Sequence, residues 1–314
     1  MTTRDIIVAG GSAGSVDALT RMTAQLPEDL PAALLLSVHM PPLGRSLLPE
    51  ILSRSTPLKV SFAENGSPIE YGSMLIAPPD RHLIVEKEHV HLSRGPKENH
   101  VRPAINPLFR SAALAYGPRV IGVLLSGALD DGVSGLWELK RRGGIGVVQS
   151  PDDAGHPNIP LNAISHVGAD HIGTAEEIGV LLRGLTRQTV GEKIQEAIPM
   201  AGIPTSISCP ECRGHLDLFL EGDLAEYRCR VQHTYSPEAM IAAHAETEER
   251  TLWSAVVTLE EGAEVAEKLA PKLPEDVRAM VQESIGRRRE AARQIRGFIE
   301  SVNGRYPHSA RGAR

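Results

Sequence analysis

The stretch that decides the fold is residues 6–15, which run Ile6-Ile7-Val8-Ala9-Gly10-Gly11-Ser12-Ala13-Gly14-Ser15. Apolar residues followed at once by small ones are typical of a buried strand that turns sharply into a helix. Gly10, Ser12 and Gly14 fit the pattern G-x-S-x-G, in which small neighbours leave the serine hydroxyl exposed at the carboxyl end of a strand. The stretch therefore predicts the first strand of an α/β domain and makes Ser12 a candidate nucleophile.

The alternation of apolar and amphipathic segments continues to about Thr186 and predicts a doubly wound, mostly parallel sheet with helices on both faces. The expected parallel strands are Ile6–Ala9, Ala33–Val38, Leu58–Ala63, Val120–Ser126, Ile145–Gln149 and His171–Ile172. The expected helices are Ser15–Gln25, Arg45–Ser55, Pro103–Tyr116, Gly132–Arg142, Pro160–Val167 and Ala175–Arg187. The segments Ser73–Ala77, His82–Glu86 and His89–Ser93 are too closely spaced for crossover helices, so we expect an antiparallel edge.

The chain of 314 residues is longer than one ordinary core requires, and its pattern changes near residue 190. Three cysteines lie together in the next segment, and apolar residues then recur every three or four positions on both sides of Pro271 and Pro274, which predicts a helical hairpin. The expected divisions are an α/β domain at 1–188, a linker with room for a short helix at 189–206, a cysteine module at 207–236, a helical hairpin at 237–302 and a disordered tail at 303–314.

Composition excludes several classes of function. The net charge of −6 and the aromatic content of 4% argue against a protein that grips nucleic acid. The apolar runs are too short to insert in a membrane, and the first residues lack the apolar region of a signal peptide. We therefore expect a cytoplasmic protein.

Two further polar residues follow predicted strands, His39 after residues 33–38 and Asp131 after residues 120–126. Because the carboxyl ends of parallel strands share one edge of the sheet, we expect Ser12, His39 and Asp131 to meet there as a triad. In this arrangement Asp131 accepts the Nδ1 proton of His39. The N–H groups of Ala13 and Gly14, at the start of a helix, are placed to hold an oxyanion.

Alternative roles for these residues stay open. Asp131 can also cap a helix, and Asp130 can take either role. The glycine turn can simply lead into a helix or hold a phosphate. A dinucleotide site is disfavoured, because Ser12 stands in the place of the second glycine and the second strand ends in His39 instead of an acid.

With these residues, the segment from residue 5 to about 186 resembles the catalytic domain of the chemotaxis protein-glutamate methylesterase family, CheB. The matching stretches are Val8–Gly14, His39–Pro42, Ala77–His82, His100–Pro103 and Leu125–Gly132. The resemblance implies that Ser12 is the nucleophile, His39 the general acid and base, and Asp131 the residue that orients His39. It also implies hydrolysis of γ-glutamyl methyl esters on the cytoplasmic helices of chemoreceptors, deamidation of certain glutamines, and no cofactor for catalysis.

The resemblance also suggests substrate contacts and shows departures from the family pattern. Met40, Arg102 and Ala128 are the expected substrate-binding residues, with a surface phosphate or carboxylate as the alternative partner of Arg102. Ala128 replaces the family's usual methionine, and Ser15 stands where a glycine is common. The family archetype carries an N-terminal receiver domain, whereas this chain starts at the catalytic strand, so we expect a receiver-less form without phosphorylation control in cis. A non-catalytic scaffold of a chemosensory system is the alternative function.

The cysteine window has the spacing C-x₂-C-x₁₆-C-x₃-H, formed by Cys209, Cys212, Cys229 and His233. Two close pairs of soft or borderline ligands predict a closed tetrahedral site that binds structural zinc. His215 and His244 compete for the place of the fourth ligand. Beyond this zinc-ribbon-like module, the two helical runs are expected to bury their apolar stripes against each other, and oligomerisation or docking on a partner helix is the alternative.

Overall fold

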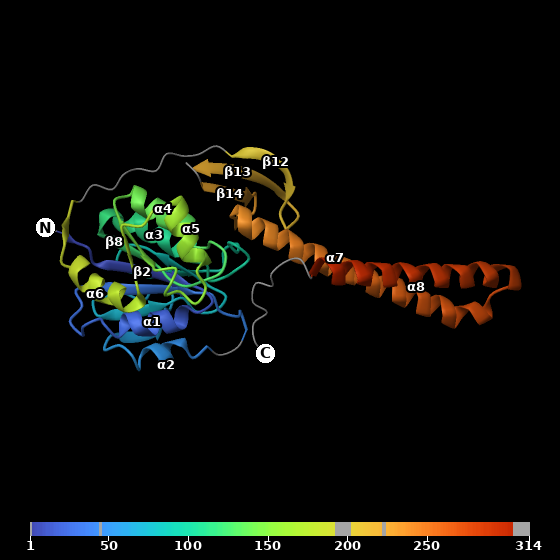
Figure 1. Cartoon of the computed structure of the whole chain (residues 1–314), viewed down its shortest axis with the longest axis horizontal. Helices are drawn as coiled ribbons and strands as arrows, with labels where there is room; N and C mark the ends of the chain where they lie inside the picture. Colours follow the sequence, from blue (N-terminus) through green and yellow to red (C-terminus); the bar gives the residue numbers. More distant parts are fainter. Residues whose placement is uncertain (1, 44–45, 192–201, 222–223, 304–314) are drawn as a thin grey trace. The chain divides into compact units, whose positions relative to one another are not determined.

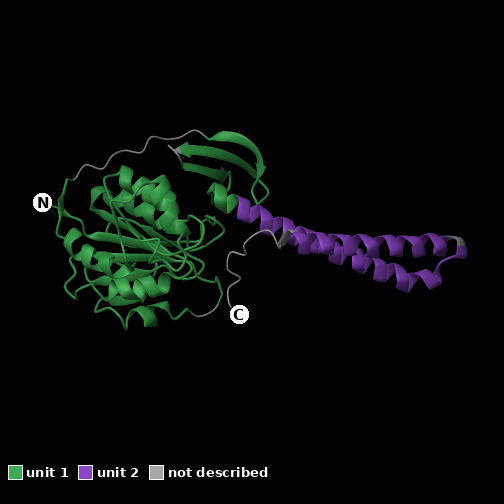
Figure 2. Cartoon of the chain, viewed as in Figure 1, with its two compact units in different colours: residues 1–240 green, residues 241–314 purple. Residues whose placement is uncertain are grey.

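The computed structural model describes residues 2–43, 46–191, 202–221 and 224–303 (Figure 1). The chain divides into two compact units, Met1–Met240 and Ile241–Arg314, shown in different colours in Figure 2. The first unit contains an α/β layer and a small antiparallel sheet. The second contains two long helices.

The α/β layer is built on a seven-stranded sheet with the order β10-β9-β8-β2-β3-β5-β4. Every pairing between its neighbouring strands is parallel. The strands are β2 (Ile6–Gly11), β3 (Ala33–Val38), β4 (Lys59–Phe62), β5 (Ser73–Ile76), β8 (Val120–Leu124), β9 (Ile145–Gln149) and β10 (His171–Gly173). The four central strands β8, β2, β3 and β5 are buried along their whole length, so the apolar runs read from the sequence mark the middle of the sheet.

Helices cover both faces of this sheet, as a doubly wound fold requires (Figure 1). One hydrophobic cluster packs α1 (Ser15–Thr23), α2 (Leu48–Leu52) and α6 (Ala175–Leu185) on one face. A second cluster packs α3 (Ile105–Tyr116), α4 (Val133–Arg141) and α5 (Asn158–His166) on the other. The short 3₁₀ helix η1 (Gly117–Arg119) leads from α3 into β8. The predicted α/β class is confirmed.

The expected antiparallel edge is wrong. β5 lies inside the sheet between β3 and β4 and pairs with both in parallel. Ten residues connect β4 to β5, and they contain no crossover helix. A short connection without a helix is typical of antiparallel pairing, but this one joins two parallel strands. The other two segments, β6 (His82–Val85) and β7 (Val90–Ser93), pair antiparallel with each other in a separate two-stranded sheet that packs against α3.

Several bounds also differ from expectation. α2 is five residues long instead of eleven, and Arg45 lies outside the described residues. In the expected linker, β11 (Thr189–Val190) pairs with β1 (Thr2–Thr3), while residues 192–201, where a short helix was considered, lie outside the described residues.

The cysteine module is a four-stranded antiparallel sheet of β12 (Ile203–Ser208), β13 (His215–Glu221), β14 (Leu224–Cys229) and β15 (Thr234–Tyr235), in that order. We call this sheet and its turns, residues 203–236, the ribbon. It begins four residues earlier than the sequence predicts, because the alternating residues of β12 pair with β13. The ribbon belongs to the same compact unit as the α/β layer.

The second unit consists of most of α7 (Pro237–Leu269), the short η2 (Ala270–Lys272) and α8 (Glu275–Asn303). Small and branched residues are buried between the two helices, among them Val256, Ala263, Ile285 and Ala292. Ion pairs join Glu260 to Arg296 and Glu267 to Arg289 across the helices. The predicted tail was to begin at Asn303, which is instead the last residue of α8, and residues 304–314 lie outside the described residues. None of the helices in the described ranges combines the length and apolar character needed to span a bilayer.

Candidate active site

Three polar side chains meet at the carboxyl edge of the parallel sheet. Ser12 follows β2, His39 follows β3, and Asp131 lies in the loop between β8 and α4. The Ser12 hydroxyl Oγ lies 3.0 Å from Nδ1 of His39, and Nε2 of His39 lies 2.7 Å from Oδ2 of Asp131. The structure thus brings together all three residues that the sequence singled out, in one hydrogen-bonded series.

The two ring nitrogens of His39 have the opposite partners to those expected. Nδ1 faces the hydroxyl and Nε2 faces the carboxylate, so the expectation that Asp131 binds Nδ1 is wrong. The reason is the position of the two partners relative to β3, the strand that His39 follows. β3 lies directly beside β2, so the proximal nitrogen already meets Ser12, whereas the loop that carries Asp131 follows β8 on the far side of β2 and is met by the distal nitrogen.

The turn after β2 leaves backbone donors free beside the hydroxyl. Gly14 has a φ of 76°, a left-handed conformation that favours glycine, and a Cβ there would lie 2.7 Å from Oγ of Ser126. Ser126 Oγ donates to the carbonyl of Ala13 and fixes this turn. In the described part of the chain the N–H groups of Ala13 and Gly14 have no hydrogen-bond partner. They can therefore receive a developing oxyanion.

Asp131 is buried and surrounded by donors. Its Oδ2 accepts from the N–H of Ile105 at 2.6 Å, and its Oδ1 from the N–H of Asn106 at 3.4 Å. Burial alone raises the pKa of Asp131, but the hydrogen bonds from His39 and from these two N–H groups outweigh it and hold the pKa below its ordinary value. Asp131 therefore caps the start of α3, a helix distant in sequence, and not the helix that follows it.

Asp130 takes neither of the roles left open for it. Its Oδ1 accepts a hydrogen bond from Ser236 Oγ at 2.6 Å, which joins the loop to the ribbon. Burial raises the pKa of Asp130 to about 7, and the neighbouring carboxylates Glu238 and Asp131 add to the rise against the hydrogen bond from Ser236. Asp130 thus links the loop that carries Asp131 to the ribbon.

The expected substrate contacts have different surroundings. Met40 is half-buried and packs against the hydrophobic cluster that contains residues of α1, α2 and α6. Ala128 is half-buried in the loop that carries Asp131. The guanidinium of Arg102 binds Asp80 through Nε and Nη2, at 3.0 and 2.6 Å, and two backbone carbonyls through Nη1. Arg102 is therefore an internal anchor of the neighbouring loops.

The sequence did not single out two asparagines that hold the site together. Asn106 Oδ1 accepts the N–H groups of Gly132 and Gly135, at 3.0 and 2.8 Å, and so ties α3 to the loop of Asp131. Asn99 Nδ2 lies 3.3 Å from Oδ1 of Asp131. The position of Asn99, next to the His100–Pro103 stretch, is the one signal that could have drawn attention to it.

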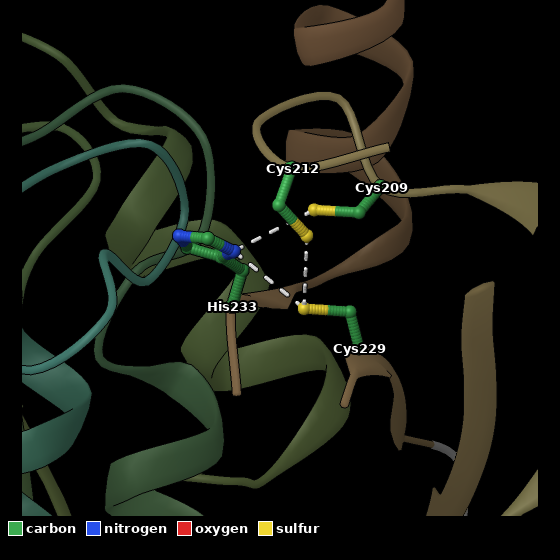
Figure 3. Close-up of side chains that lie close together, drawn as sticks. All are labelled: Cys209, Cys212, Cys229 and His233. Atoms are coloured by element: carbon green, nitrogen blue, oxygen red, sulfur yellow. Dashed lines mark hydrogen bonds between the residues drawn. The ribbon is translucent and has the colours of Figure 1, made fainter. Parts of the chain in front are cut away.

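The four residues of the predicted metal site lie together in the ribbon (Figure 3). The sulfurs of Cys212 and Cys229 are 3.7 Å apart, and Nδ1 of His233 lies 3.7 Å from the sulfur of Cys209 and 3.5 Å from that of Cys229. For tetrahedral zinc, ligand bond lengths place two sulfurs about 3.8 Å apart and a sulfur and a nitrogen about 3.5 Å apart. The donor set and its spacing fit such an ion. His215 is exposed beside Asp217 and does not belong to the group.

Comparison with known proteins gives a consistent result for the α/β layer. A family model described as CheB methylesterase matches residues 7–182, more than half of the chain. The solved catalytic domain of the Thermotoga maritima CheB methylesterase superposes with a TM-score of 0.56 and 30% identity, and the match covers 59% of this chain and 100% of that domain.

Curated relatives carry similar names. A protein-glutamate methylesterase/protein-glutamine glutaminase 2 of Methanosarcina acetivorans is 42% identical over 149 residues, which are 45% of this chain and 42% of that protein. A putative protein-glutamate methylesterase/protein-glutamine glutaminase of Leptospira interrogans is 32% identical over 190 residues, which are 60% of this chain and 98% of that protein. The chain thus spans less than half the length of its Methanosarcina relative but nearly all of the Leptospira one.

Proposed function

Because the chain belongs to the CheB methylesterase family, we propose that it hydrolyses glutamate γ-methyl esters on chemoreceptor-type signalling proteins. The observation that carries this proposal is the continuous series from Ser12 Oγ through His39 to Asp131. A hydroxyl, an imidazole and a buried carboxylate in this order are the elements of a nucleophilic triad. The imidazole of His39 is half-buried, whereas the carboxylate behind it is fully buried.

In the first half of the reaction, Ser12 Oγ attacks the ester carbonyl carbon while Nδ1 of His39 takes the hydroxyl proton. The carbonyl oxygen becomes an oxyanion, which the N–H groups of Ala13 and Gly14 stabilise. The tetrahedral intermediate collapses, the bond to the methoxy oxygen breaks, and His39 gives its proton to the departing oxygen to form methanol. The γ-glutamyl group stays on Ser12 as an ester.

In the second half, water attacks the acyl-enzyme, and His39 takes the proton of the water and returns it to Ser12 as glutamate leaves. Asp131 keeps Nε2 protonated, which leaves the lone pair of Nδ1 directed at the hydroxyl, and it stabilises the imidazolium in each step. The same acyl-enzyme arises from a glutamine side chain if ammonia replaces methanol as the leaving group. Deamidation therefore belongs to the proposed activity.

We also propose that Cys209, Cys212, Cys229 and His233 bind one zinc ion. Two of the thiols are buried, no water-bearing position is needed for the esterase chemistry, and the ligand spacing fits a closed site. When bound, the ion supplies folding energy to the ribbon by cross-linking its two turns. The proposed reaction uses only side chains and backbone groups of the α/β layer, and we propose that it takes place in the cytoplasm on receptor helices.

Methanol release from methylated receptor fragments tests the function. The wild-type chain should release methanol and leave glutamate, detected by mass spectrometry of receptor peptides, and Ser12→Ala should abolish release. Ser15→Ala is the matched control, because the Ser15 hydroxyl donates to the backbone carbonyl of Ser12 and touches no side chain of the triad. Release that continues unchanged in Ser12→Ala would refute the mechanism and leave the scaffold alternative.

A further inference from the structure

The ribbon contacts the segment that lies directly beside Asp131. The N–H of Asn99 donates to the carbonyl of Thr234 at 2.8 Å, and Glu98 forms a parallel bridge with Thr234. On the next residue, Nδ1 of His100 lies 2.9 Å from Oε1 of Glu211, and its ring packs edge-on against Tyr235 at 5.6 Å. Residues 98–100 are therefore held by the ribbon.

The side chain of Asn99 connects the ribbon to the triad. Its Oδ1 accepts the N–H of Ser236 at 3.0 Å. Because a backbone N–H can only donate, this contact fixes the amide orientation and leaves Nδ2 facing Asp131 Oδ1 at 3.3 Å. One amide thus joins the ribbon to the carboxylate that orients His39.

The backbone of this segment is held in an unfavourable conformation. Asn99 has a φ of 48° and His100 a φ of 68°, two consecutive non-glycine residues in the left-handed region. Such conformations persist only where the surroundings fix them. In the described part of the ribbon, residues 98–100 contact Glu211, Thr234, Tyr235 and Ser236, so loss of ribbon structure would release Asn99 from its place beside Asp131.

The partners of Asn99 are continuous with the metal-ligand group. Thr234 directly follows the ligand His233, and the hydroxyl of Tyr235 lies 3.8 Å from the sulfur of Cys209. Cys229 N–H donates to the His233 carbonyl at 3.1 Å and closes the turn between the last two ligands. An ion that fixes this turn also fixes residues 234–236.

We propose that Asn99 is a positioning residue through which the ribbon acts together with the first turn of α3 to orient Asp131, so that filling the Cys209, Cys212, Cys229 and His233 site with zinc raises the rate of acyl transfer at Ser12. This inference rests on the proposed esterase function and adds a regulatory effect of the ribbon on the rate of the reaction. The zinc ion takes no part in the reaction, and its effect reaches the site through residues 234–236 and Asn99.

The test uses the full chain with zinc bound and compares Asn99→Ala with Asn162→Ala. Asn162 is a matched control, because its amide also joins the catalytic loop to the start of α7, through Leu129 and Glu238, without contact with the triad. Loss of one hydrogen bond to a carboxylate should lower kcat for methanol release, and the rate of Ser12 labelling by a serine-directed phosphonate, about tenfold. KM should stay unchanged, since ground-state binding is not affected. Asn162→Ala should stay within about twofold of wild type.

Two further measurements separate positioning from a structural role. Asn99→Asp keeps the acceptor for Ser236 but replaces the donor to Asp131 by a second carboxyl group, and because two carboxyl groups this close share a proton, the pH profile of kcat/KM should gain a limb that the wild type does not show. Cys212→Ser, which removes an exposed metal ligand, should slow phosphonate labelling about as much as Asn99→Ala does. The double variant should be little slower than either single one, because both act through the same contact.

The outcomes are distinguishable. If the wild-type chain is labelled and Asn99→Ala is labelled equally fast, the inference fails while the proposed function stands. If the losses in Asn99→Ala and Cys212→Ser multiply in the double variant, coupling through Asn99 is refuted. If labelling follows the expected pattern but no methanol is released from methylated receptor, the substrate assignment fails and the inference stands. If the wild-type chain is not labelled at Ser12, both are overturned.

Discussion

His39 reaches Asp131 through its distal nitrogen, with Nε2 at 2.7 Å from Oδ2. The same oxygen accepts the N–H of Ile105 at 2.6 Å, so the first turn of α3 holds the carboxylate in place independently of the imidazole. A backbone N–H group thus helps to position the Asp131 side chain. A substitution can therefore remove its negative charge while the surrounding structure stays in place.

Asp131→Asn should remove that charge with little change in shape. An amide cannot stabilise the imidazolium, and it sets the tautomer of His39 wrongly, so we expect kcat for methanol release to fall by roughly 10³ to 10⁴. The folded structure should remain, as judged by circular dichroism. A variant that folds and retains more than about a tenth of the wild-type kcat would contradict the proposed role of Asp131.

Asp130 should make stability depend on pH. Its pKa is about 7 in the folded protein because of burial, whereas an unfolded chain releases this proton near pH 4. The folded state therefore binds more protons between these values, and the free energy of unfolding falls as pH rises from about 4 to 7.

In Asp130→Asn the free energy of unfolding should no longer fall in this way as the pH rises. At pH 8 the variant should be more stable than wild type by about 2 kcal/mol, less than the ~4 kcal/mol that three pKa units represent, because Asp130 is only partly shielded from water. At pH 4.5 the two should be nearly equal. Urea unfolding at both pH values measures this, with Asp152→Asn at an exposed carboxylate as control. An equal difference at both pH values would rule out the titration of Asp130 as its source.

Gly14→Ala should damage both stability and activity. The left-handed φ of 76° strains any Cβ by about 1–2 kcal/mol, and the added carbon would also press on Oγ of Ser126. Gly66→Ala is the matched control, because Gly66 has a φ of 85° with open space around it and shows the cost of strain alone. We expect Gly14→Ala to lower the free energy of unfolding by at least about 1 kcal/mol more than Gly66→Ala. Equal losses in urea unfolding would show that the contact with Ser126 does not matter.

Metal analysis should find one zinc ion per chain. Cys229→Ser should lose the ion, because it removes a buried ligand, while His215→Ala should keep it, because His215 lies outside the group. A chelator should lower the unfolding temperature of the wild-type chain by roughly 5 °C or more, and added zinc should restore it. Elemental emission spectroscopy and differential scanning calorimetry measure the two effects, and a metal-free wild-type chain with the same unfolding temperature would refute the structural role.

Local sequence predicted most of the α/β layer because its central strands are buried on both faces and their apolar runs are continuous. The position of β5 was not predictable in this way, since pairing depends on contacts with β3 and β4 that spacing along the chain does not reveal. The G-x-S-x-G turn and the rule that strand ends share an edge sufficed to place Ser12, His39 and Asp131 together.

The finer features of the site depend on three-dimensional distances. The choice of ring nitrogen in His39 follows from which strand neighbours β2, and the internal role of Arg102 follows from the position of Asp80. Asn99 was missed because its partners, Ser236 and Asp131, lie 137 and 32 residues away in the chain. No local sequence pattern identifies an amide side chain that bonds the ribbon through its oxygen and the α/β layer through its nitrogen.

The pairing of β1 with β11 brings the first and last strands of the α/β layer side by side, with Thr2 opposite Val190. Arg4 N–H also donates to the carbonyl of Gln188 at 3.2 Å. The two ends of this layer therefore meet in space, and the pairing closes the layer behind its last helix without involving any of the strands that carry the triad.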